Sequence, residues 1–128
     1  MRGLLDTSVF IAEEQGRELA TDRLPDEAAV SVITLAELEL GVHMATTDEI
    51  RARRMRTVGA VRSTYLALPV TEDVASAFAE IVATARRDGR RPTVQDAWIA
   101  ATARAHAVAV YSQDADFDDF SGITVIRV

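Results

Sequence analysis

Short runs of β-forming apolar residues alternate with longer helical stretches along this 128-residue chain. The runs that predict strands are residues 3–5, 29–33, 67–70, 108–111 and 124–127. The stretches that predict helices are residues 7–14, 17–24, 34–45, 48–66, 71–87 and 93–107. Strands that are joined through helices run parallel within one sheet. The sequence therefore predicts an α/β fold with a parallel sheet and helices on both of its faces.

Composition limits the chemistry that is open to the chain. With 48% hydrophobic and 27% charged residues, it is typical of one globular domain, expected to span residues 1–128. The absence of cysteine excludes disulfides, thiolate metal sites and cysteine nucleophiles, and because all 14 basic residues are arginine, lysine-based catalysis is excluded as well. No segment resembles a signal peptide or is apolar over the roughly 18 residues of a membrane span, so we expect a cytoplasmic protein that does not enter a membrane.

The net charge of −6 bears on the choice of ligand. Nucleic-acid-binding proteins are usually basic, so this charge argues against RNA or DNA. The objection weakens if several carboxylates bind a divalent cation, because they then no longer act as free negative charge. The placement of the acidic residues is therefore decisive.

Acidic residues follow the ends of several predicted strands. Asp6 follows the first strand, Glu37 lies shortly after the second, and Asp114 and Asp116 follow the fourth. Parallel sheets bind ligands outside the carboxyl ends of their strands, which favours a functional role. Each acid also has a structural interpretation as a helix cap or turn residue, and the segment from Thr34 to Glu37 matches a capping box.

Helical periodicity favours a functional role for two of the acids. Glu37 shares one arc of its helix with Leu40 and Met44, whereas Glu39 lies on the opposite side. We therefore expect Glu37 to point into the protein and Glu39 to point into solvent. Asp96 is the only acid in an otherwise apolar helix, and a buried carboxylate needs either a partner or a cation.

Topology brings the acids together. The helix that carries Asp96 has to end at the amino edge of the sheet to lead into the strand at residue 108, so it begins at the carboxyl edge, where Asp6, Glu37 and Asp114 lie. Ligation by carboxylate and water oxygens alone is typical of Mg²⁺ or Mn²⁺ and not of zinc. The sequence therefore predicts a divalent-metal site at this edge.

Four segments of the chain resemble the PIN domain, and more narrowly the VapC toxins of bacterial toxin–antitoxin pairs. They are residues 4–11 (LLDTSVFI), 31–41 (SVITLAELELG), 95–103 (QDAWIAATA) and 111–117 (YSQDADF). The resemblance covers nearly the whole chain. It implies a three-layer fold with a five-stranded parallel sheet in the order 3-2-1-4-5. It further implies Mg²⁺-dependent endoribonuclease activity, in which a metal-activated water hydrolyses RNA phosphodiester bonds.

The same resemblance implies roles for individual residues and partners. The residues that match the catalytic acids are Asp6, Glu37, Asp96 and Asp114. The implied ligands of Mg²⁺, with Mn²⁺ as a substitute, are Asp6, Asp96, Asp114 and Asp116. Ser8 or Thr7 matches the supporting polar residue after the first acid, and Ser112 matches a polar position two residues before the fourth. The implied partners are a VapB-type antitoxin and an RNA substrate, with the toxin a homodimer that forms a heterotetramer or larger assembly with the antitoxin.

Arginine is concentrated in two clusters. The first consists of Arg51, Arg53, Arg54, Arg56 and Arg62, and we interpret it as a solvated helix face with acidic partners. The second consists of Arg86, Arg87, Arg90 and Arg91; it borders the loop before Asp96 and is the candidate for contacts with RNA phosphates. We expect Trp98 in the core and no catalytic role for His43 or His106.

Two alternatives to a nuclease remain at this stage. One is a noncatalytic PIN-like binding module, which the complete set of four acids argues against. The other is a Mg²⁺-dependent phosphoryl-transfer or receiver-type α/β domain. Receivers use a lysine near the phosphate, and this chain has none.

Overall fold

Five parallel strands form one sheet at the centre of the computed structural model, which describes all 128 residues except the side chain of Asp119. The strands are β1 (Arg2–Leu5), β2 (Glu27–Ser31), β3 (Leu66–Leu68), β4 (Ala109–Ser112) and β5 (Val125–Arg127). Their order is β3-β2-β1-β4-β5, and every neighbouring pair is parallel. The expected sheet order is thus confirmed.

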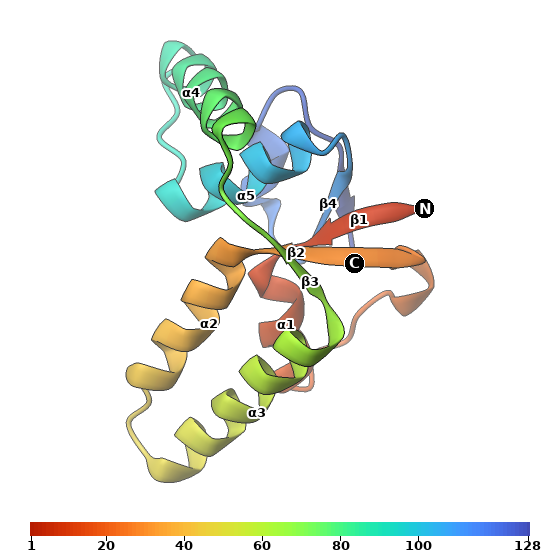
Figure 1. Ribbon diagram of the computed structural model, residues 1–128, viewed down its shortest axis with the longest axis vertical. Coiled ribbons are helices and arrows are strands. Elements are labelled where there is room, and N and C mark those ends of the chain that lie inside the picture. Colours follow the sequence, from red (N-terminus) through yellow and green to blue (C-terminus); the bar gives the residue numbers. More distant parts are fainter.

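Helices cover both faces of this sheet (Figure 1). One side carries α1 (Thr7–Glu14), α2 (Val32–His43) and α3 (Asp48–Thr64), and the other carries α4 (Glu72–Arg87) and α5 (Val94–Ala105). Two short 3₁₀ helices, η1 (Thr21–Arg23) and η2 (Ala115–Asp119), complete the described elements. Of the helix expected over residues 17–24, only the single turn η1 is present. No helix of the described chain is long and apolar enough to cross a membrane.

The core consists of two clusters, one on each face of the sheet. Consecutive residues of a strand point to opposite faces, so Leu4 packs with the α4 and α5 side and Leu5 with the α1 and α3 side. Trp98 packs against the first cluster and stacks on Phe78 with ring centroids 3.8 Å apart, as expected for a core residue. The small side chains of α5 allow it to lie directly against the sheet, where Ala100 is fully buried.

The start of α2 differs from the prediction. The capping box implied that Thr34 is the N-cap, but the helix begins at Val32 and its N-cap is Ser31, whose hydroxyl accepts a hydrogen bond of 3.0 Å from the amide of Ile33. Accordingly β2 ends at Ser31 and not at residue 33. Two hydroxyl residues three positions apart offer competing caps, and tertiary packing decides between them. Thr34 consequently lies inside the helix and is fully buried.

Arginines of α3 hold this helix against α2. Arg54 donates to the carbonyl of Gly41 at 2.6 Å, Arg51 donates to the carbonyl of Ala45 at 3.3 Å, and Arg62 forms an ion pair with Glu39. Guanidinium groups near the end of a helix bind the carbonyls that have no partner within the helix. The expected acidic partners are present for Arg51, which pairs with Asp48, and for Arg62, whereas the half-buried Arg54 binds a backbone carbonyl instead.

Candidate active site

Asp6 is the most buried acid of the site. It follows β1 directly, is 3% exposed and is the N-cap of α1. Its Oδ2 atom accepts hydrogen bonds from the Ser112 hydroxyl at 3.0 Å and from the Ser8 amide at 3.3 Å. Both of these hydrogen bonds end on Oδ2, and a carboxylate has a second oxygen with which it can bind a ligand. The capping role and the functional role expected for Asp6 are therefore compatible.

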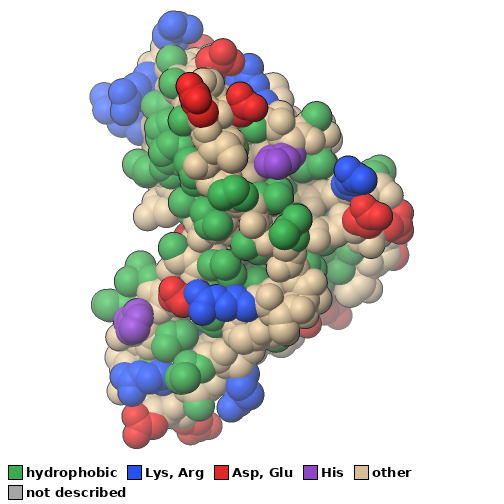
Figure 2. All heavy atoms as spheres, viewed as in Figure 1, with side chains coloured by type: hydrophobic (Ala, Val, Ile, Leu, Met, Phe, Trp, Pro, Cys, Tyr) green, Lys and Arg blue, Asp and Glu red, His purple; other side chains and the backbone are tan. Residues whose placement is uncertain are grey.

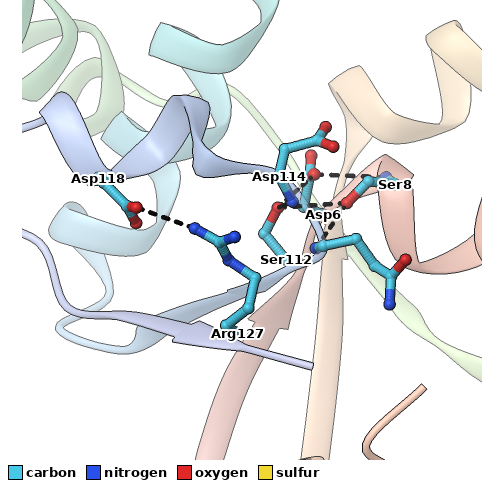
Figure 3. A network of polar contacts seen from close by, with 7 residues as sticks. Asp6, Ser8, Ser112, Asp114, Asp118 and Arg127 are labelled. Carbon is cyan, nitrogen blue, oxygen red and sulfur yellow. Dashed lines mark hydrogen bonds and ion pairs between the residues drawn. The ribbon is translucent and has the colours of Figure 1, made fainter. Parts of the chain in front are cut away.

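Two serine hydroxyls connect Asp6 to the loop after β4 (Figure 3). The Ser8 and Ser112 hydroxyls lie 3.2 Å apart, and they accept hydrogen bonds of 3.0 Å from the amides of Gln113 and Asp114, respectively. Because the proton of Ser112 is directed to Asp6, the proton between the two serines comes from Ser8. This network places Asp114 beside Asp6.

Glu37 enters the site from the first half of α2. It is half-buried, and its Oε1 atom accepts a hydrogen bond of 2.7 Å from the hydroxyl of Thr7. The prediction assumed that the helix arc shared by Glu37, Leu40 and Met44 is buried. This assumption was wrong, because Leu40 and Met44 are 58% and 68% exposed. Glu37 faces inward because Thr7 binds it, not because it belongs to an apolar stripe.

Asp96 comes from the first turn of α5. Thr93 is the N-cap of this helix, and its hydroxyl accepts a hydrogen bond of 3.2 Å from the Asp96 amide. The Asp96 side chain is half-buried. As topology predicted, α5 begins on the side where β1 and β2 end (Figure 1).

The acids of the site influence one another's pKa values. Burial raises the pKa of Asp6, and the hydrogen bonds from Ser8 and Ser112 oppose this change. Burial also raises the pKa of Glu37, and the negative charges of Asp6 and Asp96 add to the effect. The pKa of Asp96 is raised by burial and then by the charges of Asp6, Asp116 and Asp114. Five carboxyl groups therefore share one electrostatic environment.

The donor set suits a hard divalent cation. It consists of carboxylate and hydroxyl oxygens, which are typical ligands of Mg²⁺ and Mn²⁺. In the described part of the chain, no three acidic or histidine side chains already form a group that could hold a metal ion. Binding a cation would therefore have to draw mutually repelling carboxylates closer together.

Part of the second arginine cluster reaches the acids. Arg90 and Arg91 line a hollow of about 210 Å³ together with Thr93, Asp96 and Asp116. Figure 2 shows basic side chains gathered over the end of α4 and the loop that follows. Arg86 and Arg87 lie in the last turn of α4, and neither lines this hollow. The cluster is therefore divided, with only its loop residues at the site.

Several polar residues lie outside the site. Asp118, close to Asp116 in sequence, forms an ion pair of 2.8 Å with Arg127 of β5 (Figure 3). His43 is exposed on α2, and His106 is the C-cap of α5, as expected for residues without a catalytic role.

The sequence pattern assigned Thr34 only to a helix cap, although its hydroxyl lies 3.0 Å from that of Thr7 at the site. The spacing of three residues between Thr34 and Glu37 was the available signal, because it places both on one helix face.

Comparisons with known proteins identify relatives of this chain. The family model of the PIN domain matches residues 3–123. Ribonuclease VapC5 from Mycobacterium tuberculosis is 44% identical over 129 aligned residues, covering 98% of this chain and 95% of that protein. Ribonuclease VapC4 from the same organism is 41% identical, covering 99% and 97%. The crystal structure of VapBC-5, a member of the VapBC family of toxin–antitoxin systems from M. tuberculosis, superposes with a TM-score of 0.91 at 42% identity, covering 99% of this chain and 98% of that one.

Proposed function

This chain belongs to the PIN-domain family and, within it, to the VapC group, and from that premise we propose that it is the ribonuclease toxin of a toxin–antitoxin pair. We further propose that it is an endonuclease that requires Mg²⁺ or Mn²⁺ and hydrolyses RNA phosphodiester bonds. The observation that supports the proposal is that Asp96 interacts electrostatically with Asp6, Glu37 and Asp114, which come from three other segments of the chain.

The carboxylates would have different roles in such a reaction. Asp6, Asp96, Asp114 and Asp116 would hold the cation. The bound ion would supply an activated water and neutralise negative charge that develops on the phosphate. Glu37 is held by Thr7 at Oε1 alone among the described contacts, so Oε2 is open to accept a proton from the attacking water.

The loop between α4 and α5 supplies positive charge next to the acids. Arg91 is exposed, lines the same hollow as Asp96 and has no ion-pair partner among the described side chains. A guanidinium in this position can bind an RNA phosphate on either side of the bond that is cut. The overall charge of −6 then does not oppose RNA binding, because the basic groups are local and the acids are engaged by the metal.

The partner is inferred from the solved relative. VapBC-5 is a member of the VapBC family of toxin–antitoxin systems, and a chain of its crystal structure superposes on this one over nearly its whole length. We therefore propose a VapB-type antitoxin as the partner of this chain. We also propose that the toxin forms a homodimer, and that two toxins and two antitoxins form a heterotetramer or a larger assembly.

The test is cleavage of RNA by the purified chain with Mg²⁺, with Mn²⁺ and with EDTA. We expect cleavage with either metal, none with EDTA, and none by Asp96→Asn, which should retain the circular dichroism spectrum of the wild type. Cleavage that persists in EDTA or in Asp96→Asn would refute the metal-dependent mechanism. Binding of RNA and metal without cleavage would identify a noncatalytic module instead.

A further inference from the structure

Thr34 occupies an unusual position for a polar residue. It is fully buried, it lies within α2 and not at the start of this helix, and its hydroxyl makes its described hydrogen bond to the Thr7 side chain. Thr7 opens α1 and is 6% exposed. The two threonines therefore join the beginnings of two helices at the carboxyl edge of the sheet.

The direction of the hydrogen bonds follows from proton counting. Thr7 Oγ1 lies 2.7 Å from Glu37 Oε1 and 3.0 Å from Thr34 Oγ1. A hydroxyl has one proton, which cannot serve both oxygens at once. An ionised carboxylate only accepts, so the proton of Thr7 is directed to Glu37. The 3.0 Å contact with Thr34 fixes the rotamer of Thr7, and the Thr34 side chain contributes no other hydrogen bond among the described residues.

Glu37 needs such support because its neighbours repel it. Asp6 and Asp96 carry charge of the same sign close to it, and the half-buried side chain could otherwise rotate toward solvent. A glutamate has three rotatable side-chain bonds, so one hydrogen bond at its end decides where its carboxylate lies. That bond is effective only if the rotamer of Thr7 is itself fixed.

We propose that Thr34 is a positioning residue that acts through Thr7 and holds the carboxylate of Glu37 toward Asp6 and Asp96. Thr34 does not touch the reacting groups. The inference rests on the proposed function, because it assigns Glu37 to a metal-dependent site. Glu37 is not among the proposed ligands, but its negative charge beside Asp6 and Asp96 favours a bound cation. Loss of one buried hydroxyl should therefore weaken metal binding even though every carboxylate is retained.

The first experiment compares Thr34→Val and Thr34→Ser by isothermal titration of Mn²⁺, with melting of the metal-free proteins measured alongside. Outer-shell partners of metal ligands typically affect affinity by about 10- to 100-fold. Thr34 acts on Glu37 through Thr7 and not by direct contact. We therefore expect Thr34→Val to weaken Mn²⁺ binding by about 10-fold, the lower end of that range. Thr34→Ser should bind like the wild type because it keeps the hydroxyl.

A matched control is available in α5. Thr102 is also fully buried, and its hydroxyl donates to the Trp98 carbonyl of its own helix at 2.8 Å. Thr102→Val therefore removes a buried threonine hydroxyl without touching the acids, and it should leave Mn²⁺ affinity unchanged. If Thr34→Val does not fold, Thr34→Ser and Thr34→Ala provide the comparison, because they differ by one hydroxyl group.

A double substitution tests whether Thr34 acts through Glu37. In a Glu37→Gln background, Thr34→Val should produce no further loss of Mn²⁺ affinity, since the group that it positions has already been changed. Equal Mn²⁺ affinities of Thr34→Val and Thr102→Val would overturn the inference and leave the proposed function standing. So would an additive loss in the Glu37→Gln background. If the wild type itself binds no Mn²⁺, the proposed function fails, and the inference fails with it.

Discussion

The hydroxyl of Ser112, at the end of β4, donates a 3.0 Å hydrogen bond to Oδ2 of Asp6, which follows the neighbouring strand β1. The same hydroxyl accepts the amide of Asp114. One fully buried side chain therefore sets the positions of two acids that lie 108 residues apart in sequence.

Ser112→Ala should damage both stability and metal binding. It removes one hydrogen bond from the buried Asp6 carboxylate and leaves the Asp114 amide without its partner, which typically costs about 1–3 kcal/mol of unfolding free energy. We expect a similar loss in urea unfolding and about a 10-fold weaker Mn²⁺ affinity. Ser63→Ala is the control, because Ser63 is exposed and its described hydrogen bond is to the Ala60 carbonyl of its own helix. Wild-type Mn²⁺ affinity in Ser112→Ala would contradict the role of this network.

The metal-free protein should lose stability as the pH rises. Burial and the neighbouring charges raise the pKa of Asp96 in the folded state above its value of 3.8 in an unfolded chain. Folding therefore favours the protonated form, so the destabilising effect is absent below the unfolded pKa and complete above the folded pKa. We expect the melting temperature in EDTA to fall as the pH rises from about 4 through the raised pKa.

Asp96→Asn should flatten this pH dependence and raise the melting temperature at pH 7, because it removes one of the repelling charges. Asp22→Asn, at an exposed residue of η1, serves as the control and should follow the wild-type curve. An Asp96→Asn protein that melts below the wild type at pH 7 in EDTA would refute the account.

Glu37 and Glu39 should differ sharply in function. Glu37→Gln changes a carboxylate inside the acid cluster and should reduce RNA cleavage to background. Glu39→Gln breaks a surface ion pair with Arg62, and such pairs contribute about 0–1 kcal/mol. We therefore expect wild-type cleavage from Glu39→Gln, with a shift in unfolding free energy within that range. Comparable losses of cleavage in both variants would show that the assignment of Glu37 is wrong.

Arg91→Ala should weaken RNA binding without loss of the fold. Removing one phosphate contact reduces affinity for all sequences alike, and it lowers the slope of log affinity against log salt by about 1. The measurement is RNA binding by catalytically inactive Asp96→Asn at several salt concentrations, with and without Arg91→Ala. Arg53→Ala, in the separate hollow between α1 and α3, is the control. An unchanged salt slope in the Arg91→Ala protein would exclude a phosphate contact.

Ala107→Gly should stabilise the protein. Ala107 follows α5 with φ of 54°, a left-handed conformation that costs a non-glycine residue roughly 1–2 kcal/mol. Glycine removes this strain but gains freedom in the unfolded chain, so the net gain should be up to about 1 kcal/mol in urea unfolding. Ala52→Gly, on the exposed face of α3, should instead lose about 1 kcal/mol. A destabilised Ala107→Gly would show that the backbone there is not strained.

Sequence patterns predicted the sheet and its acids well because both depend on local rules. Alternating strands and helices impose a parallel sheet, and topology then places Asp6 and Asp96 at the same edge. The order of the strands came from the family resemblance and not from the residues, since no local rule tells which neighbour each strand pairs with.

The prediction failed where a tertiary contact decides between equivalent local options. Ser31 and Thr34 both satisfy the rules for an N-cap, and only the position of Thr7 shows why Thr34 lies inside the helix. The same limitation explains Leu40 and Met44. Periodicity identifies an apolar arc, but it does not reveal whether α3 packs on that arc or beside it.

Asp6 performs two tasks that make different demands on one side chain. The start of α1 needs an oxygen with a lone pair directed at the Ser8 amide, whereas a cation needs the negative charge. An asparagine meets the first demand and fails the second, and an alanine fails both. A silenced toxin made with asparagine would thus retain the shape that a neutralising partner recognises, and would differ from the active protein by a single charge.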